Sequence, residues 1–543
     1  MIATPHSLAS GAGLDALKNG GSAVDAAIAA NAVLCVGYPH MAGLGGDGFW
    51  LVADPDAEQV RALNASGPAA EAATRTYYTE QGYDEIPTRG PEAALTVPGA
   101  VDGWRQVHEA YGQLAWSRLF DDAVEYAREG IAVGRSLADW LVEDESLLSA
   151  HPSAGEVFLP DGDRPKEGEL IRQPALADSL ETLADEGPRD GFYEGEIGGA
   201  ICDDLGGRGS PLAESDFADF EANWVEPCST TYRDHTVHAF PPNTQGFTVL
   251  EILNLIEAFD VEAWGDNTAD YYHHLAEAVK VAFADRDAWL TDPEFVDIPL
   301  EQFTSKAYAD DRRGLIDAES SLEMGAVDPG VAFDGAARTN RTSGGAGGSG
   351  GADGDTVAFS AVDSDGLAVS AIQSIYHDFG SAEIGGDTGI ILQNRGSFFS
   401  LDESHPNRLE PGKRTFHTLM PGMVTRDGEP YLAYGTMGGE GQPQTQAAVL
   451  TRLIDFGYDV QQAIEAPRWL MGRTWGAESN DLSLESRISD EVMRELAARG
   501  QPVKPLFDWD DNMGHAQAIR IDPETGHLEG GADPRSDGAA LGY

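Results

Sequence analysis

The sequence has few positive charges for its length. Its 543 residues include 35 lysines and arginines against 91 aspartates and glutamates, so the formal net charge is −56. Proteins that bind nucleic acids or anionic membranes need a basic surface, so the sequence predicts neither partner. The acidic residues are spread along the whole chain, and such a surface repels itself unless salt screens it. The charge therefore indicates a halophilic protein adapted to a high-salt cytoplasm.

Cysteines and long apolar runs are also scarce. Cys35, Cys202 and Cys228 are too few and too widely spaced for a disulfide framework or a zinc site, and we expect buried thiols. No stretch approaches the ~18 apolar residues of a membrane span. Residues 1–6 lack the basic and apolar regions of a secretory signal. These absences predict a cytoplasmic location and no membrane partner.

The N-terminal part of the sequence predicts two helices followed by a strand. Two helices are expected within residues 9–37, with Ser22 and Asp25 as a capping box for the second, followed by a strand at 49–53. Between them, residues 43–48 match the dinucleotide fingerprint GxGxxG. That fingerprint needs a strand before it and a helix after it, the reverse of the order here, so we interpret it as a packed turn. Residues 98–330 are predicted to be mostly helical.

The composition of the sequence changes at residues 335–355, which are rich in glycine. This composition predicts a flexible segment. A strand–turn–strand pattern follows directly, and counting from its turn places Ser374 beside Thr356. If the chain were cut between Asp355 and Thr356, Thr356 would own a hydroxyl nucleophile and a free α-amine that can serve as its base. A plain strand residue is the alternative interpretation of Thr356 by itself.

A second glycine cluster follows a predicted strand at 431–434. Gly438 and Gly439 are consecutive, so their backbone N–H groups could point together into a cavity, as an oxyanion hole requires. A simple glycine turn is the alternative.

Taken together, several segments of the sequence resemble the γ-glutamyltransferase (γ-glutamyltranspeptidase) family of N-terminal-nucleophile hydrolases, over essentially the whole chain. The segments that carry the resemblance are residues 20–27, 39–49, 97–103, 276–286, 355–356, 411–414 and 438–439. The resemblance implies an α+β fold, a four-layer αββα sandwich. It also implies a proenzyme that cuts itself between Asp355 and Thr356 into a large subunit, 1–355, and a small subunit, 356–543, which form one composite domain.

The resemblance also implies roles for individual residues. Thr356 is expected to be the nucleophile, and Ser374 lies where the family has a threonine that bonds to the nucleophile. The pair Gly438–Gly439 matches the oxyanion hole. His417 and Thr418 fall where many members have paired serines that hold the substrate carboxylate.

Three positions depart from the family pattern. The arginine that binds the γ-glutamyl α-carboxylate should fall near Asn64 or Ala65, and no arginine is there. The aspartate that receives the α-amino group is Phe398 here, and Tyr376 replaces a substrate-contacting asparagine. A desolvated zwitterion needs a partner for each of its charges, so this chain is expected to be a divergent member.

Arg89 and Arg395 remain as candidates for binding a carboxylate, because the arginine fork contacts both oxygens; a structural salt bridge is the alternative for each. We expect hydrolysis or transfer of a small-molecule amide through a threonyl acyl-enzyme, without a metal or cofactor. The first substrate hypothesis is a γ-glutamyl amide such as glutathione. A second is another carboxylate-bearing amide, an oxamate or glutaryl amide. A non-catalytic acidic binding protein that never matures is the hypothesis from another class.

Overall fold

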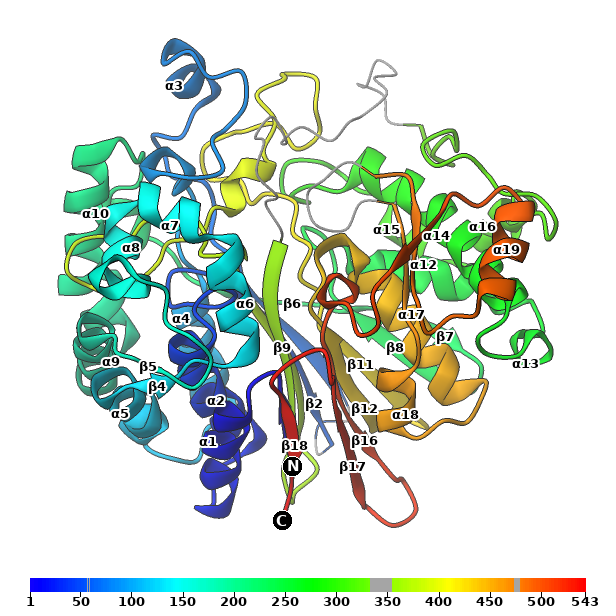
Figure 1. The fold of residues 1–543 in the computed structure, drawn as a ribbon, viewed down its shortest axis with the longest axis horizontal. Coiled ribbons are helices and arrows are strands. Elements are labelled where there is room, and N and C mark those ends of the chain that lie inside the picture. Colours follow the sequence, from blue (N-terminus) through cyan, green and yellow to red (C-terminus); the bar gives the residue numbers. More distant parts are fainter. Residues whose placement is uncertain (56, 58, 333–353, 473–478) are drawn as a thin grey trace.

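Two β-sheets lie face to face in the centre of the molecule, and helices cover the outer face of each (Figure 1). This arrangement confirms the predicted four-layer αββα sandwich. The computed structural model describes residues 1–55, 57, 59–332, 354–472 and 479–543. Most of the predicted flexible segment 335–355 therefore lies outside the described residues.

The first sheet has seven strands and contains the predicted hairpin at its centre. In spatial order its strands are β18 (Ala539–Leu541), β1 (Ile2–Thr4), β9 (Gly354–Val362), β10 (Ala368–His377), β2 (Asp47–Asp54), β3 (Gln59–Ala65) and β6 (Asn223–Val225). The N-terminal strand β1 thus pairs with strands from the C-terminal part of the chain on both sides.

The second sheet has six strands. In spatial order they are β17 (Leu528–Ala532), β16 (Ala516–Ile521), β12 (Glu429–Thr436), β11 (Gly422–Arg426), β8 (His235–Ala239) and β7 (Cys228–Tyr232). Strand β12 packs against β9 of the first sheet, so the two sheets meet directly beside the hairpin.

The helices form the two outer layers. Those on the side of the first sheet include α1 (Ser7–Lys18), α2 (Ala23–Gly37), α4 (Ala100–Tyr111), α5 (Asp121–Glu129), α9 (Pro174–Gly187) and α10 (Glu196–Arg208). Those on the side of the second sheet include α12 (Gly246–Ile256), α14 (Ala269–Trp289), α17 (Gln442–Ile454), α18 (Val460–Glu465) and α19 (Asp490–Ala498). Two smaller sheets complete the described fold: β4 (Ile131–Ala132) with β5 (Leu170–Ile171), and β13 (Trp469–Met471) with β14 (Leu482–Glu485) and β15 (Val503–Leu506).

Helix α2 shows how local sequence fixes an element. It begins after Ser22, whose Oγ accepts a hydrogen bond from the Asp25 N–H, while Asp25 accepts one from the Ser22 N–H. This capping box is the predicted one. Every residue of α2 is buried, because the helix is packed between the sheet and the outer helices and has small apolar side chains all round.

Residues 98–330 are mostly helical, as predicted, and they also contribute β6, β7 and β8 to the two large sheets. One expectation needs correction. Cys35 and Cys202 are buried free thiols, but Cys228 is only partly buried. The physical reason is its position on β7, the edge strand of the second sheet.

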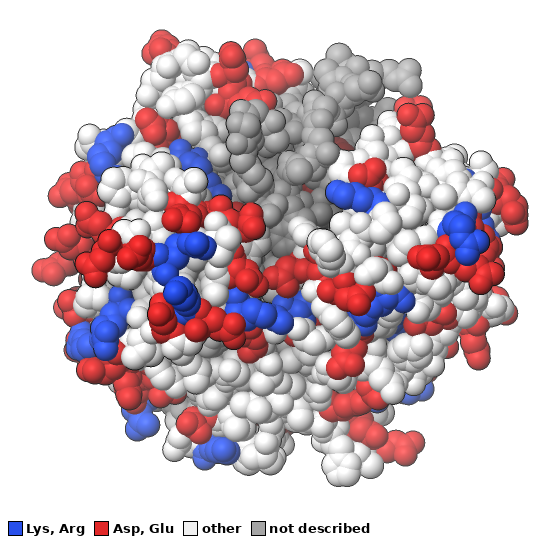
Figure 2. All heavy atoms as spheres, viewed as in Figure 1, with Lys and Arg blue, Asp and Glu red and all other residues white. Residues whose placement is uncertain are grey.

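Acidic side chains are scattered over the visible surface and outnumber basic ones, as the net charge of −56 requires (Figure 2). Within the described part of the chain, no helix has both the length and the apolar composition needed to cross a lipid bilayer.

Candidate active site

Thr356 and Ser374 lie side by side at one end of the central hairpin. Val357 is the register partner of Gln373, and the next printed pair is Asp355 with Tyr376, so Thr356 faces a bulge that contains Ser374. This confirms the register counted from the turn. Side chains at even positions of both strands, such as Ala358 and Ile372, belong to the core between the sheets, so both hydroxyls face that space.

Both hydroxyl residues are buried. Thr356 is 1% exposed, and its Oγ1 has no hydrogen-bond partner in the described structure. The Oγ of Ser374 accepts a hydrogen bond from the Tyr376 N–H at 2.8 Å. Tyr376 has a φ of 81°, in the left-handed region that a tyrosine rarely adopts, and it is the register partner of Asp355. The bulge therefore concentrates backbone strain beside the predicted cleavage position.

Gly438 and Gly439 follow β12 and begin a short 3₁₀ turn, η6 (Gly439–Gly441), which packs against β9. Their φ values are 130° and 52°, conformations that favour glycine. In the part of the chain that the structure describes, no acceptor is recorded for either N–H group. Two unused donors on a turn against the strand of Thr356 are what an oxyanion hole needs.

A network of buried hydrogen bonds and one ion pair fixes the position of this turn. The side-chain amide of Gln245 donates to the carbonyl of Gly439 at 2.9 Å and to that of Thr418 at 2.9 Å. Arg286 donates to Gln245 Oε1 at 3.0 Å and pairs with Glu440 Oε2 at 2.9 Å. Through Glu440 and Gln245, Arg286 therefore connects helix α14 to the turn that contains Gly438 and Gly439.

Asp47, on β2, is the register partner of Ser374 and is also buried. Its Oδ1 accepts hydrogen bonds from the N–H groups of Gly67 and Gly99 and from the side chain of Gln393, and its Oδ2 lies 3.2 Å from His417 Nε2. Burial raises the pKa of Asp47 to about 6, although these donors and Arg395 oppose the shift. Burial also holds the pKa of His417 well below its ordinary value, so His417 is neutral.

Arg395, on the 3₁₀ turn η5 (Arg395–Phe398), reaches the hydroxyls beside Thr356. Its Nη2 lies 3.4 Å from Ser374 Oγ and its Nη1 lies 3.2 Å from Thr418 Oγ1. The guanidinium packs over the ring of Tyr376, 4.2 Å from the ring centre. Burial lowers the pKa of Arg395 to about 10, which still leaves it charged at neutral pH.

The other predicted carboxylate-binding arginine, Arg89, is already paired within the protein. Arg89 Nη2 pairs with Asp378 Oδ2 at 2.7 Å, and its Nη1 donates to the carbonyls of Asp378 and Gly380. This is the structural salt bridge that was the alternative for Arg89, because its fork is already occupied by the loop after β10.

Two of the three substituted family positions, Asn64 and Phe398, are held by contacts with the surrounding protein. Asn64 Nδ2 donates to Asn243 Oδ1 at 2.9 Å, so the position expected to hold an arginine is part of an amide network. The ring of Phe398, in place of an aspartate, contacts the rings of Tyr376 and Phe416, with centres 4.5 and 4.6 Å apart.

Three of the predicted residues therefore meet around Arg395, namely Ser374, Tyr376 and Thr418, and Ser374 lies opposite Thr356. His417 contacts Asp47. Sequence reasoning missed Asp47, Gln245 and Arg286 as parts of the site, because they come from distant segments without a local motif. An acidic residue within the glycine-rich turn 43–48 was the one available signal for Asp47.

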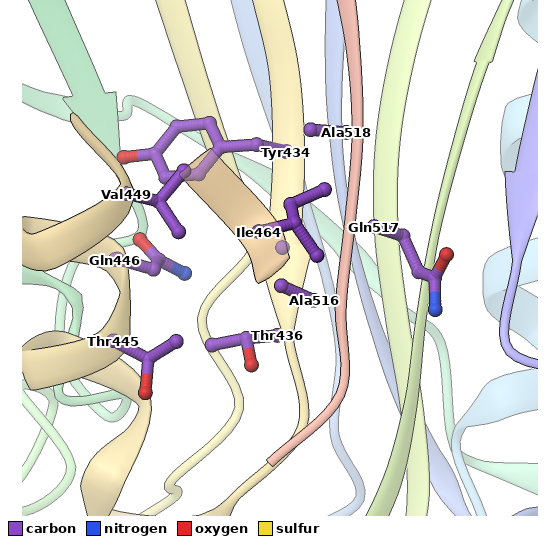
Figure 3. Close-up of a pocket in the computed structure, with 10 residues that line it drawn as sticks. Tyr434, Thr436, Thr445, Gln446, Val449, Ile464, Ala516, Gln517 and Ala518 are labelled. Atoms are coloured by element: carbon purple, nitrogen blue, oxygen red, sulfur yellow. The ribbon is translucent and has the colours of Figure 1, made fainter. Parts of the chain in front are cut away.

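Among the described residues, no group of three histidine, cysteine or acidic side chains is placed to hold a metal ion. A small cavity behind β12 is separate from the site (Figure 3). Tyr434, Gln446 and Val449 gather there between β12 and α17, whereas Gln517 lies on the other side of β16. We assign it no function.

The chain is similar to known proteins over almost its whole length. Residues 9–543 match the family described as Gamma-glutamyltranspeptidase. The glutathione hydrolase-like YwrD proenzyme of Bacillus subtilis is 45% identical, over 100% of this chain and 98% of the relative. The oxamate amidohydrolase proenzyme of Klebsiella pneumoniae is 41% identical over the same shares. A cephalosporin acylase structure from Bacillus halodurans has a TM-score of 0.90 at 36% identity, over 100% of this chain and 96% of that one. The chain belongs to the gamma-glutamyltranspeptidase family and is an enzyme with the N-terminal-nucleophile hydrolase fold.

Proposed function

We propose that this protein is a self-processing amide hydrolase whose nucleophile is Thr356. The observation that carries the proposal is the buried, unpartnered Thr356 hydroxyl, which faces the space between the sheets beside Ser374 and on the strand against which the Gly438–Gly439 turn packs. The printed names of the relatives from B. subtilis and K. pneumoniae, both proenzymes, support maturation by cleavage.

Maturation begins with attack of Thr356 Oγ1 on the carbonyl carbon of Asp355. The peptide C–N bond breaks, the departing nitrogen takes up the hydroxyl proton, and an ester joins residue 355 to the threonine oxygen. Water then hydrolyses the ester, leaving a carboxylate on Asp355 and a free α-amine on Thr356. The products are the subunits 1–355 and 356–543.

Turnover uses the same oxygen. The Thr356 α-amine accepts the hydroxyl proton while the oxygen attacks the substrate amide carbonyl, and the N–H groups of Gly438 and Gly439 stabilise the oxyanion. The amine product leaves with that proton, and water releases the acyl group as a carboxylate. An amine in place of water would give transfer.

Two acyl groups are candidates. A γ-glutamyl amide such as glutathione agrees with the family, and the name of the B. subtilis relative supports it. A smaller carboxylate-bearing amide is favoured by Arg395 beside Ser374 and by Phe398 and Asn64, neither of which carries the charge that a γ-glutamyl zwitterion requires.

The test is the Thr356→Ala variant, incubated in molar salt and analysed by denaturing gel, intact mass and amide hydrolysis. We expect a single uncut chain without activity. Ser360→Ala is the matched control, because it removes another buried, unpartnered hydroxyl from the same face of β9. That control should be cut and active. A Thr356→Ala protein that still forms two subunits would refute the proposal.

A further inference from the structure

Arg395 differs from the other fully buried arginines of the described structure. Its residue is 1% exposed, and no carboxylate within ion-pair distance of its guanidinium is recorded. The other four each have an acidic partner: Arg286 with Glu440, Arg452 with Asp266, Arg468 with Asp533 and Arg535 with Glu485. A buried charge without a partner is costly, so this position calls for an anion.

The contacts of Arg395 leave part of its fork unused. Among the described residues, its two terminal nitrogens reach only the hydroxyls of Ser374 and Thr418, and its Nε has no acceptor. Asp47 is the carboxylate whose charge acts on Arg395, but its oxygens already accept from two backbone N–H groups, Gln393 and His417. The guanidinium is therefore a charged donor group directly beside Ser374, the residue that faces Thr356 across the hairpin.

The side chains packed around the Arg395 guanidinium are aromatic, and the guanidinium already lies over their faces. Its carbon Cζ lies 4.2 Å from the ring centre of Tyr376 and 5.5 Å from that of Phe398, and Phe416 packs behind Phe398. These rings provide no carboxylate for an ammonium group, which would also be repelled by the guanidinium. An anion without a neighbouring positive charge fits this environment.

The distance to Thr356 limits the length of the acyl group. Arg395 contacts Ser374, which lies in the bulge that faces Thr356, and opposed residues of antiparallel strands are about 4.5 to 5.5 Å apart between Cα atoms. A carboxylate on the guanidinium therefore lies close to the carbonyl that Thr356 attacks.

We propose that Arg395 binds the carboxylate of the substrate, and that the preferred substrate is the monoamide of a short dicarboxylic acid without an ammonium group. In such a compound the carboxylate is bonded to the amide carbonyl or separated from it by one carbon. This inference rests on the proposed function of Thr356. Hydrolysis breaks the amide C–N bond and yields the short dicarboxylate and ammonia or an amine.

The experiment compares oxamate, its uncharged analogue oxamide and γ-glutamyl-p-nitroanilide with the mature enzyme. We expect oxamate to be the best substrate. The Arg395→Gln variant should lose about 100-fold in kcat/KM for oxamate, mainly through KM, because a charge-assisted contact is removed. Its kcat/KM for oxamide should change less than about threefold, since oxamide has no carboxylate. Arg61→Gln, which removes an arginine packed over Trp224, is the control and should change neither.

The results that would contradict the role of Arg395 differ from those that would contradict the role of Thr356. A γ-glutamyl preference, or an equal loss for oxamate and oxamide in Arg395→Gln, would overturn the assignment of Arg395 while leaving Thr356 as the nucleophile. Hydrolysis by Thr356→Ala would instead overturn the proposed function.

If Arg395→Gln does not fold, oxalate is tested on the unmodified enzyme. Competitive inhibition by oxalate but not by glutamate supports the proposal, and inhibition by neither contradicts it.

Discussion

Arg286 and Glu440 form a buried ion pair, with 2.9 Å between Nη2 and Oε2, that joins α14 to the turn carrying Gly438 and Gly439. The same arginine bonds to Gln245, whose amide donates to the carbonyl of Gly439. The Gly438 carbonyl, which shares a peptide plane with the Gly439 N–H, accepts a hydrogen bond from the Gly441 N–H at 2.8 Å within the same turn. The network thus preorganises the proposed oxyanion donors before any substrate arrives.

Gln245→Leu should lower kcat about tenfold and change KM less than about threefold, because Gln245 acts on the transition state through the glycine turn. Steady-state kinetics of the mature enzyme test this. Gln173→Leu is the control, since it removes a buried glutamine that also donates to a backbone carbonyl, that of Val36. Equal losses of kcat in the two variants would contradict a positioning role for Gln245.

Gly438→Ala should lower kcat about 100-fold, because φ = 130° is strained for alanine and relaxation would turn an oxyanion donor away. Single-turnover acylation rates measure the effect. Gly428→Ala introduces a comparable strain, φ = 88°, in the open turn between β11 and β12, and should acylate normally. Normal acylation by Gly438→Ala would exclude this N–H from the oxyanion hole.

Ser374→Ala should slow both self-cleavage and turnover by at least about tenfold, because it removes the oxygen that accepts the Tyr376 N–H within the bulge opposite Thr356. Ser374→Thr keeps that oxygen and should retain most of both activities. The rates are followed by gel densitometry and by amide hydrolysis. The prediction fails if alanine and threonine at this position behave alike.

The pKa of Asp47, about 6 against an ordinary 3.8, makes stability depend on pH. The native state binds the Asp47 proton more tightly than the unfolded chain does. Its contribution is therefore fully present below about pH 4 and is lost as the pH rises through 6, at a cost of about 3 kcal/mol. The free energy of unfolding of Asp47→Asn relative to the unsubstituted protein should rise by that amount between pH 4 and pH 7.

Denaturant titrations at several pH values, made in the Thr356→Ala background so that one uncut chain unfolds, measure this difference. Stability curves that run parallel with pH, with and without the Asp47→Asn substitution, would contradict the raised pKa of Asp47.

The sequence predicted the parts of the site that depend on local pattern. Alternating residues and a tight turn were enough to pair Thr356 with Ser374, because hairpin register follows from the turn. Arg395 and Arg89 could not be distinguished, since each is an arginine near glycines. Only the fold shows that Asp378 occupies one fork and that aromatic rings surround the other.

The residues that hold the site in place could not be predicted from the sequence either. Asp47, Gln245 and Arg286 lie far from Thr356 along the chain and are brought to it by three different elements. Their hydrogen bonds are individually ordinary, and nothing in the adjacent sequence indicates which distant partner each one meets.

The strand order has a consequence for the cut protein. Strand β1 of the proposed large subunit is enclosed by β18 and β9 of the small one, and β10 and β11 of the small subunit border β2 and β8 of the large one. The two products are interleaved and do not merely touch. Cutting one peptide bond should therefore leave a molecule that melts in a single cooperative step, and halves made separately should not reassemble by simple docking, because each must thread strands into the interior of the other.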